Sequence, residues 1–187
     1  MTFAAPRVTT AAEGLPRRRF TVAEVEAMVA AGVMDEDERV ELIGGSWFPC
    51  RRREANTRRS RARSSTAGFA RPKDCRLTQE TTFRLSEDTY LEPDIVIYPR
   101  ATGLRELTGA NVLLVVEISD SSQRYDMGRK AALYASFGVR ELWVIDAARL
   151  AARVFRDPAP DGYCEAGDIG AAPCAAFRAG SVCASAR

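Results

Sequence analysis

Residues 112–146 read VLLVVEISDSSQRYDMGRKAALYASFGVRELWVID, and this stretch decides the fold. Its first seven residues, VLLVVEI, are the most apolar in the chain and are typical of a central strand buried on both faces. A polar turn over 119–123 leads into a helical pattern over 124–137, which Gly138 is placed to end. ELWVID over 141–146 then predicts a second strand. Strand, helix and strand at this spacing form a βαβ unit, whose crossover is right-handed by strong precedent.

Shorter elements precede this unit. The segment Thr21–Glu24 fits a capping box that opens a helix over 21–31. Two glycines, Gly44 and Gly45, supply a two-residue turn between two short strands. The strands expected outside the βαβ unit are 39–43, 46–48, 81–85 and 94–98. The sequence therefore predicts an α/β fold with a mixed sheet of about five strands flanked by helices.

The composition bounds the class of protein. The chain has 187 residues, 46% of them hydrophobic and 28% charged, so we expect one ordinary domain with a sizeable core. Its apolar runs are far shorter than the roughly 18 residues that cross a bilayer, and its amino terminus lacks the pattern of a secretory signal. We therefore expect a soluble, cytoplasmic protein with no membrane contact. The absence of histidine excludes histidine general bases, histidine triads and histidine metal sites.

The predicted domain is interrupted by an anomalous segment. We expect a disordered lead over 1–17, a single domain over 18–157 and an irregular tail over 158–187. From residue 44 to residue 76 there are 33 residues without one Val, Ile, Leu or Met. Such a sequence cannot offset its ordering entropy by burial, so residues 49–76 predict a solvated insert.

This insert also carries a concentrated positive charge. Residues 50–76 hold nine arginines and one lysine against one glutamate and one aspartate, a local net charge of +8. Because the whole chain carries +2, the remainder carries −6. Among the 27 basic residues only Lys73 and Lys130 are lysines, so Lys130 is the one lysine outside the arginine-rich insert.

The cysteines do not indicate a metal site. No two of them have the C-x-x-C spacing of a zinc or redox motif. Their odd number favours reduced thiols over a disulfide framework. The five cysteines occupy positions 50, 75, 164, 174 and 183.

Three charged residues lie where the predicted elements would bring them together. Asp94 follows Pro93 at the start of a strand, Glu117 ends the VLLVVEI run, and Lys130 lies on the next helix. An acid in an apolar strand is costly to bury unless it is paired or binds a cation. Two carboxylates from neighbouring strands suit Mg²⁺, and a nearby ammonium group could neutralise charge on a phosphate. The alternative is that both acids lie in solvent and Lys130 merely pairs with Asp126 at i,i+4.

Several blocks of this sequence resemble one known family in the order in which they occur. They are similar to the Uma2 family of restriction endonuclease-like proteins, within the PD-(D/E)xK nuclease superfamily. Coverage is roughly 18–48 and 82–157. The resembling blocks are Phe20–Val22, Arg39–Gly45, Leu91–Val96, Val115–Ser122, Tyr125–Lys130, Leu133–Ala135 and Gly138–Asp146.

The resemblance implies a restriction-endonuclease-like core and Mg²⁺- or Mn²⁺-dependent hydrolysis of DNA. Pro93-Asp94 would be the PD element, and Asp94 and Glu117 would be the metal ligands. Lys130 would replace the superfamily's usual lysine, whose position holds Ser119 here. Glu41 matches a further acid of the family. DNA is the implied partner, with no membrane, and a homodimer is compatible with the family.

The insert departs from the family. A histidine-bearing amphipathic helix is expected there by resemblance, and residues 49–76 contain no such pattern. A frameshift over this region and the tail would explain the composition, the cysteines and the lost periodicity together. Two alternatives to an active enzyme therefore stay open. One is a non-catalytic nucleic-acid-binding protein that uses its arginine-rich segment, and the other is an inactive, frameshifted relative.

Overall fold

The structure of the protein is a computed structural model, and the chain in it forms two compact units. One unit comprises Met1–Arg51 and Thr82–Glu92, and the other comprises Arg52–Thr81 and Pro93–Arg187. The single domain predicted over 18–157 stays a prediction. The described residues are 8–10, 14, 16–34, 38–50, 74–119, 126–146, 148–149 and 151–170.

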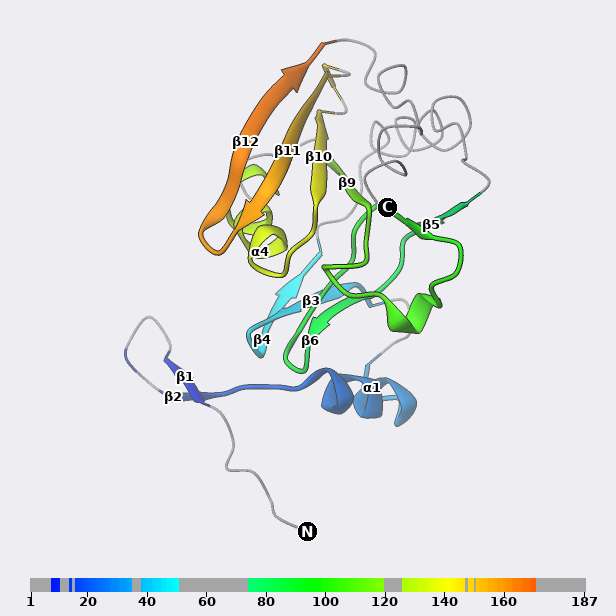
Figure 1. Ribbon diagram of the computed structural model, residues 1–187. Helices are drawn as coiled ribbons and strands as arrows, with labels where there is room; N and C mark the ends of the chain where they lie inside the picture. The colour runs from blue at the N-terminus through cyan, green and yellow to red at the C-terminus, as the bar shows by residue number, and fades with distance from the viewer. Residues whose placement is uncertain are drawn as a thin grey trace. The chain divides into compact units, whose positions relative to one another are not determined.

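The second unit contains a six-stranded mixed sheet in the order β12-β11-β10-β9-β8-β5 (Figure 1). Only the central pair β9–β10 is parallel, as the βαβ prediction requires, and the other neighbours are antiparallel. The predicted α/β class and the central place of the VLLVVEI strand are confirmed, with six strands in this sheet rather than about five. The strands are β5 (Cys75–Gln79), β8 (Ile95–Pro99), β9 (Leu114–Ser119), β10 (Glu141–Asp146), β11 (Ala151–Ala159) and β12 (Gly162–Ile169).

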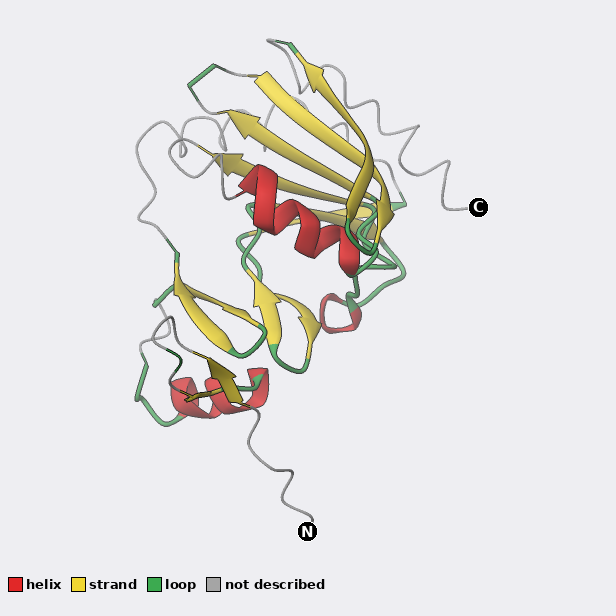
Figure 2. Cartoon of the chain, turned by 90° about the vertical axis from the view of Figure 1, so that its left-hand side faces the viewer, coloured by secondary structure: helices red, strands yellow, loops and turns green. Residues whose placement is uncertain are grey.

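The connection from β9 to β10 is helical and lies across one face of the sheet (Figure 2). It contains a π-helical turn, η2 (Asp126–Lys130), followed by α4 (Ala131–Ser136). The expected helix over 124–137 is therefore present, although its first described turn is wider than an α-helix. Residues 120–125, which include most of the predicted polar turn, lie outside the described residues.

Both faces of the central strand are buried, which explains its unbroken aliphatic sequence. Alternate residues of a strand point to opposite faces of its sheet. One face of β9 contributes Leu114, Val116 and Ile118 to a core that also includes Trp143 and Ile145 of β10. The other face of β9 carries Val115 and Glu117, and it is the face covered by α4, because Tyr134 of α4 contacts Glu117. The acid therefore lies on the helix-covered face.

The carboxyl-terminal hairpin corrects the predicted irregular tail. β11 and β12 pair from Ala152 with Ile169 to Ala159 with Gly162, so the tail from residue 158 contains an ordered strand. The sequence of β12, GYCEAGDI, lacks the β-branched pattern that signals a strand. Its order comes from backbone pairing with β11 across a two-residue turn.

The first unit is built on a four-stranded antiparallel sheet, in the order β4-β3-β7-β6. The Gly44–Gly45 turn between β3 and β4 is confirmed. Both glycines have positive φ, of 55° and 78°, which a two-residue hairpin of this kind needs. The elements of this unit are β1 (Val8–Thr10), β2 (Pro16–Arg18), α1 (Val22–Ala30), β3 (Val40–Ile43), β4 (Ser46–Pro49), β6 (Phe83–Ser86) and β7 (Thr89–Leu91).

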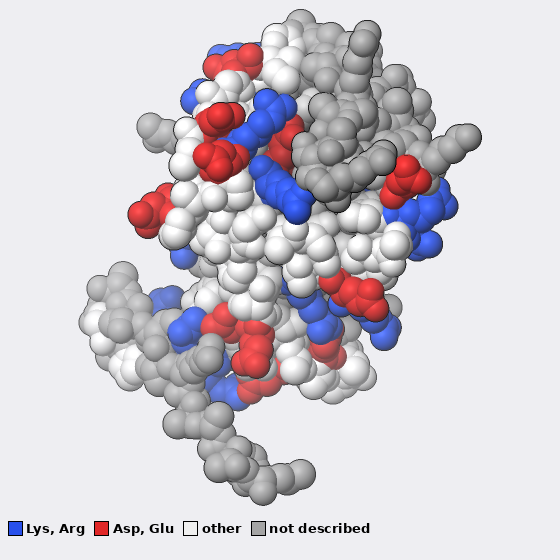
Figure 3. Space-filling model, viewed as in Figure 1, with Lys and Arg blue, Asp and Glu red and all other residues white. Residues whose placement is uncertain are grey.

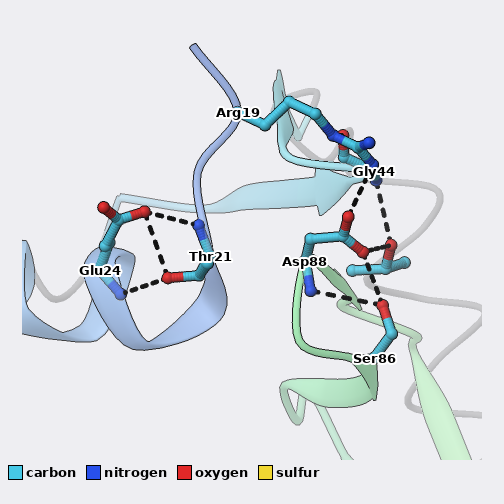
Figure 4. Close-up of polar contacts among 7 residues, drawn as sticks. Arg19, Thr21, Glu24, Gly44, Ser86 and Asp88 are labelled. Atoms are coloured by element: carbon cyan, nitrogen blue, oxygen red, sulfur yellow. Dashed lines mark hydrogen bonds and ion pairs between the residues drawn. The ribbon is translucent and has the colours of Figure 1, made fainter. Parts of the chain in front are cut away.

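The predicted disordered lead contains a short ordered piece. β1 and β2 pair as an antiparallel ribbon, so strand pairing reaches into residues 1–17. After β2 comes the predicted capping box, which is confirmed. The Glu24 N–H donates to Thr21 Oγ1 (3.2 Å), and the Thr21 N–H donates to Glu24 Oε2 (2.9 Å), as Figure 4 shows. This reciprocal pair satisfies two donors at the start of α1.

Arg19 ties the strand turns of the first unit together (Figure 4). Its Nε donates to the carbonyl oxygen of Gly44 (2.6 Å), and its Nη2 donates to Asp88 Oδ2 (2.6 Å). Asp88 Oδ1 accepts a further hydrogen bond from the Ser86 hydroxyl (2.8 Å). One guanidinium group thus joins two hairpin turns that are far apart in the chain.

Three further observations complete the fold. A single 3₁₀ turn, η1 (Leu104–Glu106), interrupts the loop between β8 and β9. Cys50 and Cys164 are reduced cysteines, whereas Cys75 is disulfide-bonded, so the expectation of reduced thiols is wrong at Cys75. Within the described ranges, no helix combines the length and the apolar character that crossing a bilayer requires.

Candidate functional site

Asp94 and Glu117 lie on neighbouring strands of the second unit. In the antiparallel pairing of β8 with β9, Ile95 is the partner of Val116. The same register carried one residue further sets Asp94 beside Glu117, with both side chains on the face that bears α4. The carboxylate of Asp94 is held by the backbone of β9, because the Ile118 N–H donates a hydrogen bond to Asp94 Oδ2 (2.5 Å).

Glu117 is held by two donors from the helical connection. Lys130 Nζ donates to Glu117 Oε1 (3.1 Å), and the Tyr134 hydroxyl donates to the same oxygen (2.8 Å). All three residues are buried: Glu117 is 5% exposed, Lys130 is 6% exposed and Tyr134 is fully buried. A buried acid is costly unless it is paired and hydrogen-bonded, and this one has both kinds of partner.

The structure also tests the alternative in which the acids are merely solvated. That reading is wrong, because Asp94 and Glu117 are only 6% and 5% exposed. The i,i+4 pair of that alternative does exist, since Lys130 Nζ lies 4.0 Å from Asp126 Oδ1. Lys130 Nζ therefore lies near the carboxylates of both Asp126 and Glu117, and it is closer to Glu117. The sequence-predicted set of Asp94, Glu117 and Lys130 gathers on one face of the sheet.

Glu41 belongs to the other unit. It is buried on β3, and its Oε1 accepts a hydrogen bond from the Glu92 N–H (3.2 Å). Nearby, Arg39 Nε donates to Glu92 Oε2 (2.6 Å). These contacts show Glu41 supporting the backbone just ahead of the Pro93-Asp94 segment in the chain. They do not join it to the three residues of the second unit.

Sequence reasoning counted Tyr134 only as a core residue. Its ring is indeed fully buried, but its hydroxyl is one of the two donors to Glu117. The available signal was its spacing of four residues from Lys130, which places both side chains on the same helix face. No pattern indicated the π-helical turn η2, although such turns are frequent at functional sites.

The donor set suits a hard divalent cation. Mg²⁺ is usually bound through one or two carboxylates together with waters and substrate oxygens. Asp94 and Glu117 supply two carboxylates on one face. Both hydrogen bonds to Glu117 from described residues fall on Oε1, so Oε2 is the oxygen left to a ligand. Within the described residues no larger group of acids and cysteines could hold a metal, so the site would depend on these two.

Comparison with known proteins identifies the family. A model of the Uma2 family, described as "Putative restriction endonuclease", matches residues 22–173. The chain belongs to the Uma2 family. The resemblance predicted from the sequence blocks is thereby confirmed, and the match spans Glu41, Asp94, Glu117 and Lys130 without assigning them roles. No curated protein matches this Uma2 chain.

A solved structure shares the fold. The Uma2 chain is similar to the crystal structure of a protein from Anabaena variabilis, described as "a putative nuclease belonging to DUF820". The two share 15% sequence identity with a TM-score of 0.59, over 80% of this chain and 84% of the other. Identity this low concerns the fold alone, and it confirms the predicted nuclease-like α/β architecture.

Proposed function

We propose that this Uma2 protein is a nuclease that hydrolyses phosphodiester bonds of DNA with Mg²⁺ or Mn²⁺. The observation that carries the proposal is the buried Glu117, fixed by Lys130 and Tyr134 and set beside Asp94 on one sheet face. A structural core gains little from such a group, because apolar residues of similar volume often stabilise a protein as well as a buried ion pair does. Membership of a family whose description reads "Putative restriction endonuclease" supports the same conclusion.

In this proposal, each residue has a distinct task. Asp94 and Glu117 would hold the cation, which when bound lowers the pKa of a water molecule and polarises a phosphoryl oxygen. Asp94 is oriented by the Ile118 N–H and Glu117 by its two side-chain donors. The Lys130 ammonium lies beside the ligand carboxylate, where it could also offset negative charge that develops on the phosphate. Glu41 is proposed as an accessory acid, on the family resemblance alone.

The decisive experiment removes ligand charge while the fold is kept. In Asp94→Asn the side-chain oxygen still accepts from the Ile118 N–H, so the backbone contact survives while the charge is lost. We expect cleavage of supercoiled plasmid, linear duplex and single-stranded DNA with Mg²⁺ or Mn²⁺ to fall at least about 100-fold. Glu117→Gln should act likewise. The matched control is Glu165→Gln, an exposed acid on β12, which should cut as wild type does.

Two results would overturn the enzyme proposal. One is a folded wild-type protein that cuts none of these substrates with either metal. The other is cleavage that survives in the Asp94→Asn variant. Binding of DNA without cleavage would favour the non-catalytic alternative, whose arginine-rich segment lies largely outside the described residues.

Most of the described charges of the six-stranded sheet lie outside that arginine-rich segment. Figure 3 shows acidic and basic side chains side by side in the region of the six-stranded sheet. Two arginines there are paired with acids across strands, Arg156 with Glu141 (2.7 Å) and Arg153 with Asp168 (3.4 Å). Paired arginines are less available for phosphate contacts. A homodimer and a cytoplasmic location stay predictions, and light scattering at assay concentration tests the first.

A further inference from the structure

Resting on the proposed function, we infer that Tyr134 is a positioning residue for the metal site. Together with Lys130 it occupies Glu117 Oε1 and thereby reserves Oε2 for a divalent cation. The inference adds a residue that neither the family match nor the sequence patterns assign.

The first support is the arrangement of donors. The ammonium of Lys130 and the hydroxyl of Tyr134 both lie within hydrogen-bond distance of one carboxylate oxygen, at 3.1 and 2.8 Å. A carboxylate oxygen has two lone pairs, so two donors fill its hydrogen-bonding capacity. The second oxygen is then the one that a cation can approach without displacing a donor that belongs to the described residues.

The second support is rigidity. Lys130 has a long, flexible side chain, whereas the phenol ring of Tyr134 is the largest fully buried side chain among the described residues. A packed ring with few rotatable bonds fixes its hydroxyl more firmly than an aliphatic stem fixes an ammonium group. Ligand carboxylates in metal sites are themselves commonly held by such hydrogen bonds, and removing these bonds weakens metal binding by about 10–100-fold.

The third support is the helix geometry. Lys130 is the last residue of η2, and Tyr134 lies four residues later in α4, so the two side chains share one face. The π-helical turn ends at the residue that first contacts Glu117. A change in helical pitch at this point affects where both donors lie, so the helical connection serves to orient Glu117.

The test measures metal binding in the absence of DNA. Mn²⁺ is titrated into the full-length protein by calorimetry, with wild type, Asp94→Asn, Tyr134→Phe and Tyr163→Phe compared. Tyr163 is the matched control, because its hydroxyl also donates one hydrogen bond of 2.8 Å, to the carbonyl oxygen of Val139. We expect the Kd for Mn²⁺ to rise about 10-fold in Tyr134→Phe and to stay within about twofold in Tyr163→Phe.

The outcomes separate this inference from the proposed function. If wild type binds Mn²⁺ and Asp94→Asn does not, but Tyr134→Phe binds within twofold of wild type or more tightly, the positioning role is wrong and the nuclease proposal stands. If wild type binds no Mn²⁺ in the absence of DNA, the inference about Tyr134 falls, and the cleavage assay decides the nuclease proposal. Should Tyr134→Phe unfold, the same measurement is made with it in a Gly167→Ala background. Gly167 lies on β12, where an added Cβ meets no atom within 4 Å, so the background substitution is expected to stabilise the protein.

Discussion

Replacing Lys130 by methionine should destabilise the second unit severely. Replacing the charged Glu117 by a neutral side chain as well should recover much of the lost stability. Methionine approximates the length of the lysine stem but carries no charge. The substitution leaves Glu117 buried without its ammonium partner and removes the neighbour of Asp126. The double variant Glu117→Gln/Lys130→Met replaces the buried ion pair by a neutral pair. In the double variant the new amide side chain can still accept a hydrogen bond from the Tyr134 hydroxyl.

The expected magnitude follows from separation and burial. At 3.1 Å, and with an effective dielectric constant of about 20, the attraction between Lys130 and Glu117 is roughly 5 kcal/mol. Both side chains are at least nine-tenths buried, so solvent screens this attraction little. Removing one partner of a buried pair typically costs about 3–5 kcal/mol, because the other charge is left uncompensated. That is a large fraction of the roughly 5–15 kcal/mol by which domains are typically stable.

The free energies of unfolding of wild type, Lys130→Met and the double variant are measured by urea denaturation, with circular dichroism as the signal. We expect Lys130→Met to lower the free energy of unfolding by about 3–5 kcal/mol, and the double variant to recover at least about half of this. The matched control is Arg153→Met, which removes an exposed ion pair to Asp168 of similar length, 3.4 Å. It should cost less than about 1 kcal/mol. A Lys130→Met variant within about 1 kcal/mol of wild type, or a double variant no more stable than the single, would refute the reasoning.

Three further predictions concern stability. Gly109→Ala should cost about 2–3 kcal/mol, because the new Cβ would lie 1.9 Å from the carbonyl oxygen of Phe137 and backbone would have to move. Thr21→Ala should cost about 1 kcal/mol, since it removes the acceptor for the Glu24 N–H. The third concerns pH: burial raises the pKa of Tyr90 from 10.0 to about 12, so the folded protein keeps this proton to higher pH than the unfolded chain. The contribution of Tyr90 to the free energy of unfolding is fully present below pH 10 and is lost as the pH rises towards 12. The Tyr90→Phe substitution should flatten this decline in stability.

Each of these has a result that would contradict it. Chemical denaturation that shows Gly109→Ala as stable as wild type would mean that the loop does not approach the helix end so closely. A Thr21→Ala variant with unchanged stability would show that the cap contributes nothing. For the pH prediction, the comparison is between wild type and Tyr90→Phe from about pH 9 to about pH 12. If the free energy of unfolding fell in parallel with pH in the two proteins, Tyr90 would not be the group responsible for the decline.

The elements predicted correctly are those whose signals are local. The capping box of Thr21 and Glu24 depends on residues three apart, and the Gly44–Gly45 turn depends on two residues with positive φ. The central strand was recognised because burial on both faces removes the usual alternation. In each case the physical cause acts within a few residues, so the sequence displays it directly.

The site was partly predictable for the same reason. A carboxylate at each of two strand ends and a lysine on the helix that follows the second strand indicate proximity once a βαβ unit is assumed. The structure gathers Asp94, Glu117 and Lys130 on one face accordingly, and their roles stay predictions. Tyr134 was missed because its hydrogen bond to Glu117 joins residues 17 apart, and only the packing of α4 on the sheet decides it.

The sequence by itself determined the family, the central βαβ unit and the residues that could carry chemistry, because these depend on residue type and short-range order. The tertiary structure alone decided most of the other strand pairings, above all that of β12, whose sequence GYCEAGDI has little strand propensity of its own and gains order from its neighbour. It also decided the π-helical turn before Lys130 and the shared oxygen of Glu117. Both are set by where a helix packs across a sheet, which is a balance of many contacts that no short stretch of sequence contains.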